Sequence, residues 1–189
     1  MPDTALLLMD FQVAIVERFA DEAEPLLAAV GRAAAGARAN GIPVVYVRVA
    51  FRPGAPEVSP NNRVFAALAD SSAFVEDGPR TQIHPSLAPR PRDVVVDKKR
   101  VSAFAGSDLD MIMRAQGVRT LVLAGIATSG VVLSTLRQAA DLDYGLTVLR
   151  DGCADADEEV HRVLLDKVFP RQADVLGVDE WIAAVGGRS

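Results

Sequence analysis

Residues 119–139, RTLVLAGIATSGVVLSTLRQA, combine an apolar run, a tight turn and a helical repeat. The run over 121–124 is apolar at every position, which is typical of a strand buried on both faces of a parallel sheet. Gly125 and Gly130 bracket the turn, and from Val131 the apolar positions recur at helical spacing. This order predicts a strand, a turn and a helix at the carboxyl edge of a sheet. The free N–H groups of such a turn can bind an anion or oxyanion, although every parallel α/β sheet contains ordinary turns of this kind.

The rest of the chain alternates short apolar segments with stretches of helical periodicity. The segments that have the length and composition of strands are residues 4–9, 42–49, 93–97, 121–124, 146–149 and 173–176. The stretches that predict helices are 22–39, 63–69, 108–116, 131–140, 157–169 and 179–185. This alternation predicts a doubly wound α/β sheet with helices on both faces. No linker divides the 189 residues, so we expect residues 1–189 to form one domain.

Residues 50–92 interrupt this alternation. They hold seven of the eleven prolines and show little periodicity apart from the short helix at 63–69. Long loops in compact α/β domains often carry function. The segment is therefore either a lid over a pocket or a solvated connector.

The composition excludes several classes of partner. Twenty Lys and Arg residues against 25 Asp and Glu give a net charge of −5, and no basic run with interleaved aromatics occurs. We therefore expect no nucleic-acid and no membrane partner. No apolar run approaches ~18 residues. The N-terminal run lies between Asp3 and Asp10 without a positive segment, so we predict no secretory signal. The single cysteine, Cys153, excludes an intrachain disulfide and favours a cytoplasmic location.

Polar residues follow two of the predicted strands. Asp10 ends the first strand, and burial there would raise the pKa of its carboxyl group and suit it to acid–base catalysis. Lys98 follows the third strand, where a buried lysine can hold a carboxylate ionised or bind a substrate anion. Gln12 is placed to orient Asp10 or bind substrate, and Phe104 to wall a pocket. The alternatives are a turn aspartate, an exposed basic corner, a solvated glutamine and a core phenylalanine.

Candidate nucleophiles are few. Cys153 lies just past the fifth predicted strand, and free cysteines are usually small buried hydrophobes. Thr128 and Ser129 carry hydroxyl groups, but a Ser-His-Asp arrangement needs His84 or His161 to approach them in the fold. The histidines show no metal-ligand spacing, and neither a dinucleotide-binding nor an NTP-binding glycine motif occurs. We therefore expect no metal ion and no cofactor.

Three places in the chain together resemble the isochorismatase-like hydrolase family, which includes nicotinamidases, carbamoylsarcosine amidases and isochorismatases. They are the strand that ends in Asp10, Lys98 four residues before Ser-Ala-Phe, and the Gly-Ile-Ala-Thr turn before a helix. The resemblance covers about residues 4–176. It implies a three-layer, Rossmann-like α/β/α fold with strand order 3-2-1-4-5-6. It also implies catalytic roles for Asp10 and Lys98, a small-molecule substrate and a homo-oligomeric state.

The resemblance also assigns roles to the turn after the fourth strand. It implies a cis peptide bond between Ile126 and Ala127, with turn amides that face the substrate as far as Gly130 and Val131. In most members a cysteine at the start of the next helix attacks an amide carbonyl, with the aspartate as base. In this chain the cysteine position is Val131, which has no nucleophilic atom. The metal-binding Asp/His set of nicotinamidases is also missing, because the segment after the second strand reads RVAFRPG.

Isochorismatases also lack the cysteine and usually carry glycine there. In those members the aspartate protonates the carbon of an enol ether, and water captures the oxocarbenium ion. Such chemistry needs an acid and a cation for the substrate's carboxylates, but no nucleophilic side chain. Three arginines are candidates for binding these carboxylates: Arg48, Arg52 and Arg100.

Three hypotheses for function follow. The first is a hydrolase of a small organic molecule, with a vinyl ether as the candidate substrate, that uses Asp10 and Lys98 without a cysteine nucleophile. The second is a binding or scaffold protein that has kept the fold and lost catalysis. The third is a hydrolase with a relocated nucleophile, Cys153 or Ser129.

Overall fold

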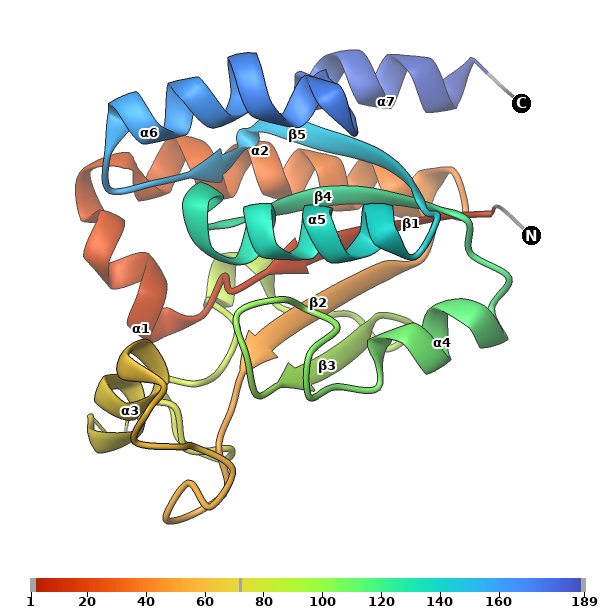
Figure 1. Cartoon of the computed structure of the whole chain (residues 1–189). Coiled ribbons are helices and arrows are strands. Elements are labelled where there is room, and N and C mark those ends of the chain that lie inside the picture. The colour runs from red at the N-terminus through yellow and green to blue at the C-terminus, as the bar shows by residue number, and fades with distance from the viewer. Residues whose placement is uncertain (1–2, 72, 188–189) are drawn as a thin grey trace.

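A six-stranded sheet forms the centre of the computed structural model, which describes residues 3–71 and 73–187. Its strand order is β3-β2-β1-β4-β5-β6, and all neighbouring strands pair in parallel (Figure 1). The strands are β1 (Thr4–Met9), β2 (Val44–Val49), β3 (Val94–Lys98), β4 (Thr120–Ile126), β5 (Gly145–Ala154) and β6 (Asp174–Leu176). The predicted α/β class and strand order are confirmed.

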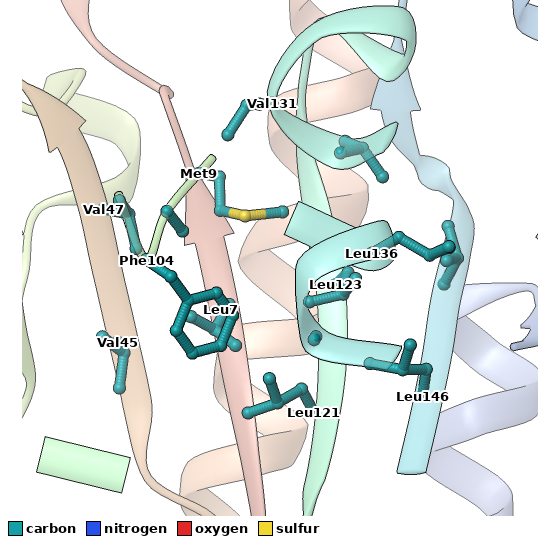
Figure 2. Close-up of a cluster of buried hydrophobic side chains, with 14 of the residues drawn as sticks. Leu7, Met9, Val45, Val47, Phe104, Leu121, Leu123, Val131, Leu136 and Leu146 are labelled. Atoms are coloured by element: carbon teal, nitrogen blue, oxygen red, sulfur yellow. The ribbon is translucent and has the colours of Figure 1, made fainter. Parts of the chain in front are cut away.

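Helices cover both faces of the sheet. They include α2 (Ala20–Ala39), α4 (Leu109–Ala115), α5 (Leu133–Asp141), α6 (Glu158–Val163) and α7 (Val178–Gly186). On one face Leu7 and Met9 of β1 pack in a cluster with residues of α4 and α5 (Figure 2). On the other face Leu6 and Leu8 pack with residues of α2 and α7. Successive strand residues point to opposite faces, and helices cover both of these faces. β1 and β4 are therefore apolar at nearly every position.

The remaining elements are short. They are α1 (Val13–Val16), η1 (Glu17–Phe19), α3 (Arg63–Asp70), η2 (Pro85–Leu87), η3 (Thr128–Val132), η4 (Leu164–Val168) and η5 (Phe169–Arg171). Within the segment 50–92, Phe51, Phe65 and Phe74 pack with Ala14 and Ile15 of α1 in a third apolar cluster. This cluster places α3 against α1 beyond the carboxyl edge of the sheet (Figure 1). None of the described helices has the length and apolar character needed to cross a bilayer.

The fifth strand is longer than the sequence predicts. β5 continues from Leu149 to Ala154, and Cys153 lies inside it, opposite Gly125 of β4. The prediction that Cys153 follows the strand is therefore wrong. A register shift between Leu123 and Gly125 lets the pairing with β4 resume, whereas pairing with β6 ends at Leu149. The polar residues of this irregular stretch have the sequence character of a turn.

Candidate active site

Asp10 and Lys98 form a buried ion pair at the carboxyl edge of the sheet. Lys98 Nζ lies 2.8 Å from Asp10 Oδ2, and the two side chains are 1% and 7% exposed. β2 lies between their strands, which are therefore roughly 10 Å apart. The long lysine side chain spans this distance, and Nζ also donates a hydrogen bond to the Val101 carbonyl oxygen (2.8 Å). The structure thus brings together the two residues that the sequence singled out as candidate catalysts.

The second carboxylate oxygen of Asp10 has no fixed partner. Oδ1 is buried and makes no hydrogen bond within the described residues. The backbone of Asp10 has a φ of 64°, a left-handed conformation that aspartate tolerates better than most residues. Its N–H donates to the Val47 carbonyl oxygen (2.8 Å), which fixes the turn at the end of β1. Burial raises the pKa of Asp10, and the Lys98 ammonium group opposes this rise. Together these features suit the carboxyl group to carry a proton.

A cavity of about 330 Å³ adjoins the ion pair, at the small end of the range for ligand pockets. Besides Asp10, Lys98, Val49, Val101 and Ala156, its lining residues come from three segments. These are α1 with η1 (Ile15, Arg18, Phe19), α3 with the loop after it (Val64, Phe65, Leu68, Phe74), and the turn after β4 (Ile126, Ala127, Gly130, Val131). The segment 50–92 therefore supplies part of the cavity wall. Most of the lining side chains are apolar, and the charged ones are Asp10, Lys98 and Arg18.

The turn after β4 reaches the cavity at the position where a nucleophile would be expected. The peptide bond between Ile126 and Ala127 is cis, and both residues line the cavity. Val131 lies beside Met9 (Figure 2), and its side chain presents only methyl groups. A Cβ atom at Gly125 would lie 3.0 Å from the Met9 carbonyl oxygen and 3.2 Å from Val131 Cγ1. A side chain at this point would crowd Met9 and Val131, and glycine therefore lets the turn approach β1 closely.

Two of the predicted substrate contacts have other positions. The Gln12 side chain is fully buried: its amide nitrogen donates to the carbonyl oxygens of Val49 (2.9 Å) and Thr81 (2.8 Å), and its oxygen accepts from Val49 N–H (2.8 Å). Phe104 packs in the core beside Leu7 (Figure 2), and its ring centroid lies 5.8 Å from that of Tyr144. Neither side chain lines the cavity. Their surroundings indicate structural roles rather than substrate contacts.

The alternative nucleophiles also lie outside the cavity wall. Cys153 is buried in β5, and this burial raises the pKa of its thiol to about 12. Ser129 is exposed, and its N–H donates to an Asp155 carboxylate oxygen (2.6 Å). The fold brings His161 Nδ1 within 2.8 Å of Thr128 Oγ1, but the Thr128 side chain is fully buried. This contact therefore braces the turn against α6 and does not expose a hydroxyl nucleophile.

The arginines that the sequence suggested for substrate carboxylates have partners elsewhere. Arg48 pairs with Asp97 (2.5 Å), Arg52 with Glu57 (3.7 Å), and Arg100 donates to the Glu57 carbonyl oxygen (2.9 Å). None of the three lines the cavity. The guanidinium group that does is Arg18, which the sequence did not single out. Among the described residues, no group of three His, Cys, Asp or Glu side chains is placed to hold a metal ion.

Comparison with known proteins agrees with this geometry. Residues 4–180 match the isochorismatase domain. The chain is 33% identical over 176 residues to the ureidoacrylate amidohydrolase RutB of Pseudomonas syringae pv. syringae (strain B728a), covering 85% of this chain and 68% of that protein. It is 33% identical over 185 residues to YecD of Escherichia coli O157:H7, an uncharacterized isochorismatase family protein, covering 96% of each. The solved structure of a cysteine hydrolase from Pseudomonas syringae pv. phaseolicola 1448A has the same fold, with a TM-score of 0.91 and 22% identity over 100% of this chain and 96% of that one. These matches confirm the resemblance and support a hydrolase.

Replacing Gln12 by methionine tests its structural role. The side chain keeps its approximate volume but leaves the Val49 N–H and two carbonyl oxygens unpaired. We expect Gln12→Met to lower the free energy of unfolding by about 2–4 kcal/mol, measured by urea denaturation. The same substitution at the exposed Gln82 is the control, with an expected change within about 0.5 kcal/mol. Equal free energies of unfolding for Gln12→Met and Gln82→Met would contradict the structural role of Gln12.

Cys153 is expected to resist alkylation in the folded protein. A thiol pKa of about 12 instead of 9.0 reduces the thiolate fraction at neutral pH. The reduction is about 1,000-fold, and thiolate is the reactive form. Iodoacetamide labelling followed by mass spectrometry should therefore be slow in the native protein and fast in denaturant. Rapid labelling of Cys153 in the folded protein, together with loss of turnover, would instead support Cys153 as the nucleophile.

Proposed function

We propose that this chain, which belongs to the isochorismatase family, hydrolyses a small organic molecule with Asp10 as general acid and water as nucleophile. The observation that carries the proposal is the combination of a buried, Lys98-paired carboxyl group on the cavity wall with a valine at the nucleophile position. Asp10 can move a proton, whereas Val131 cannot form a covalent intermediate. The substrates that suit these groups best are those that water can cleave once Asp10 has protonated them.

A vinyl ether is such a substrate. The Asp10 carboxyl group transfers its proton to the terminal carbon of the C=C–O unit, which leaves a carboxylate on the protein and an oxocarbenium ion in the cavity. Water adds to the oxocarbenium carbon and returns a proton to Asp10. The resulting hemiketal or hemiacetal breaks its C–O bond to give a carbonyl compound and an alcohol. One water is consumed, and Asp10 ends the cycle protonated.

Lys98 has two roles in this scheme. Its ammonium group, 2.8 Å from Oδ2, stabilises the Asp10 carboxylate that forms when the proton leaves. It also limits how far burial raises the pKa of Asp10, so the group stays acidic enough to protonate carbon. The fixed ion pair needs little rearrangement during the reaction, which is the usual source of electrostatic stabilisation in enzymes.

Binding without turnover is the second candidate function. Val131 favours it, because its methyl groups occupy the position from which related hydrolases attack. The cavity persists beside Val131, so a ligand can still enter. Turnover decides between the two candidates.

Replacing Asp10 by asparagine tests the proposal. Asparagine also tolerates a positive φ, so the turn is retained. We expect Asp10→Asn to lower kcat/KM by at least about 100-fold on whichever compound the wild type hydrolyses, among isochorismate, a simple carboxylated vinyl ether and ureidoacrylate. Ureidoacrylate is the substrate that the name of the RutB relatives gives, and it represents amide hydrolysis. Asp166→Asn, which removes an exposed partner of Arg150, is the control.

The outcomes separate the candidates. Full activity of Asp10→Asn removes Asp10 from the mechanism. Binding of these compounds by the wild type without any turnover supports the second candidate. Hydrolysis of ureidoacrylate alone contradicts the vinyl-ether chemistry.

The pH dependence of turnover provides an independent check. The acid form of Asp10 is required, and its pKa lies above the ordinary value of 3.8. Activity should therefore be constant at low pH and fall about tenfold per unit once the pH exceeds the raised pKa. Lys98→Met removes the opposing charge, so the residual activity should fall at a higher pH than in the wild type. A fall at lower pH in this variant would contradict the assignment of Asp10 as the acid.

A further inference from the structure

We propose that Arg18 determines substrate specificity by binding an anionic group at the solvent-exposed end of the cavity, so that the ligand is a small apolar molecule with a terminal carboxylate. Arg18 belongs to η1, a few residues after Asp10 in the chain, and it is an exposed residue that lines the cavity. The inference concerns the same cavity as the proposed function and rests on that function only for the reaction, because binding can be measured without turnover.

Of the charged residues on the cavity wall, Arg18 is the one without a partner among the described side chains. Lys98 and Asp10 contact each other at 2.8 Å. Glu17 precedes Arg18 in sequence, but its carboxylate is paired with Arg80 (2.6 Å). Within the described side chains, which exclude those of residues 20–22 and 70, none forms an ion pair or hydrogen bond with Arg18. A ligand that fills the cavity therefore meets the Arg18 guanidinium group near solvent.

The apolar residues of the cavity wall constrain the rest of the ligand. Phe19, Phe65, Phe74 and Leu68 contribute apolar side chains that carry no hydrogen-bonding group. A polar group placed against them would lose its hydration without gaining a side-chain partner, which is unfavourable. The ligand body that fits is aromatic or aliphatic, and its ionised end must lie where water and Arg18 can solvate it.

An arginine is well suited to this position. Its planar guanidinium group can donate two parallel hydrogen bonds to a carboxylate, which a neutral amide in the same place accepts less well. Because Arg18 is exposed, solvent and salt weaken the attraction. We therefore expect a preference of about tenfold for a carboxylate over its amide, since a charge-assisted hydrogen bond contributes about this factor.

Two matched pairs of probes test the inference: phenylacetate with phenylacetamide, and 4-phenylbutyrate with 4-phenylbutyramide. Dissociation constants are measured by isothermal titration calorimetry at low ionic strength for the wild type, Arg18→Gln, Arg63→Gln and Lys98→Met. In the wild type at least one carboxylate should bind about tenfold more tightly than its amide. The ratio should fall to about one in Arg18→Gln. Arg63→Gln is the matched control, because it removes an exposed guanidinium group that does not line the cavity, and it should keep the wild-type ratio.

Other results would overturn the inference. An unchanged ratio in Arg18→Gln, together with a loss of preference in Lys98→Met, would place the carboxylate at the ion pair. An equal loss in Arg18→Gln and Arg63→Gln would indicate a general effect of surface charge. Failure of both carboxylates to bind at millimolar concentration would also overturn it. These readouts are independent of the turnover of Asp10→Asn, so this inference and the proposed function can fail separately.

Discussion

The buried pair of Asp10 and Lys98 is the interaction on which the site depends. Removing either partner from such a pair leaves an uncompensated buried charge, which is strongly destabilising. The pair therefore requires that β1 and β3 end at the same level, with β2 between them, and that the lysine side chain extend across the sheet edge. The parallel register of these strands meets that requirement, since Val49 of β2 aligns with Lys98 and the Asp10 N–H bonds to Val47. The Asp10–Lys98 pair therefore depends on the register of β1, β2 and β3.

Much of the fold could be predicted because the sheet is covered on both faces. A strand with helices above and below must be apolar throughout, and such runs are visible in the sequence at β1 and β4. Asp10 and Lys98 were recognisable for a related reason, because each is a charged residue at the end of a buried run. The carboxyl ends of parallel strands gather at one edge, so both residues could be singled out as site candidates, and the family resemblance gave both a catalytic role.

The rest of the site depends on contacts that leave no local pattern. Gln12 bonds to backbone groups of residues 49 and 81, and backbone groups carry no sequence signal. The approach of His161 to Thr128 joins segments 33 residues apart. Arg18 became a candidate only when the position of α3 enclosed a cavity next to η1. The extension of β5 to Ala154 was hidden because exposed polar residues in a strand with one missing neighbour resemble a loop.

Val131 serves the core and the cavity together. Its side chain packs with Met9 beneath the turn and also faces the ligand space. A hydrocarbon side chain there holds the turn in place by packing alone, so the position no longer supplies a reactive group. In the proposed mechanism the reactive components are the Asp10 carboxyl group and a water molecule that enters with the substrate.

The hydrogen bonds of Gln12 have a consequence for how this fold diversifies. By holding Val49 and Thr81 together, the side chain closes the intervening segment into a loop whose two ends are anchored to the sheet edge. The entropy of closing a loop rises only slowly with its length. Insertions and deletions between the anchors can therefore reshape the wall around α3 while the acid and the lysine keep their positions. Changes in this segment can alter which ligands the cavity selects, whereas the residues at the sheet edge stay in place.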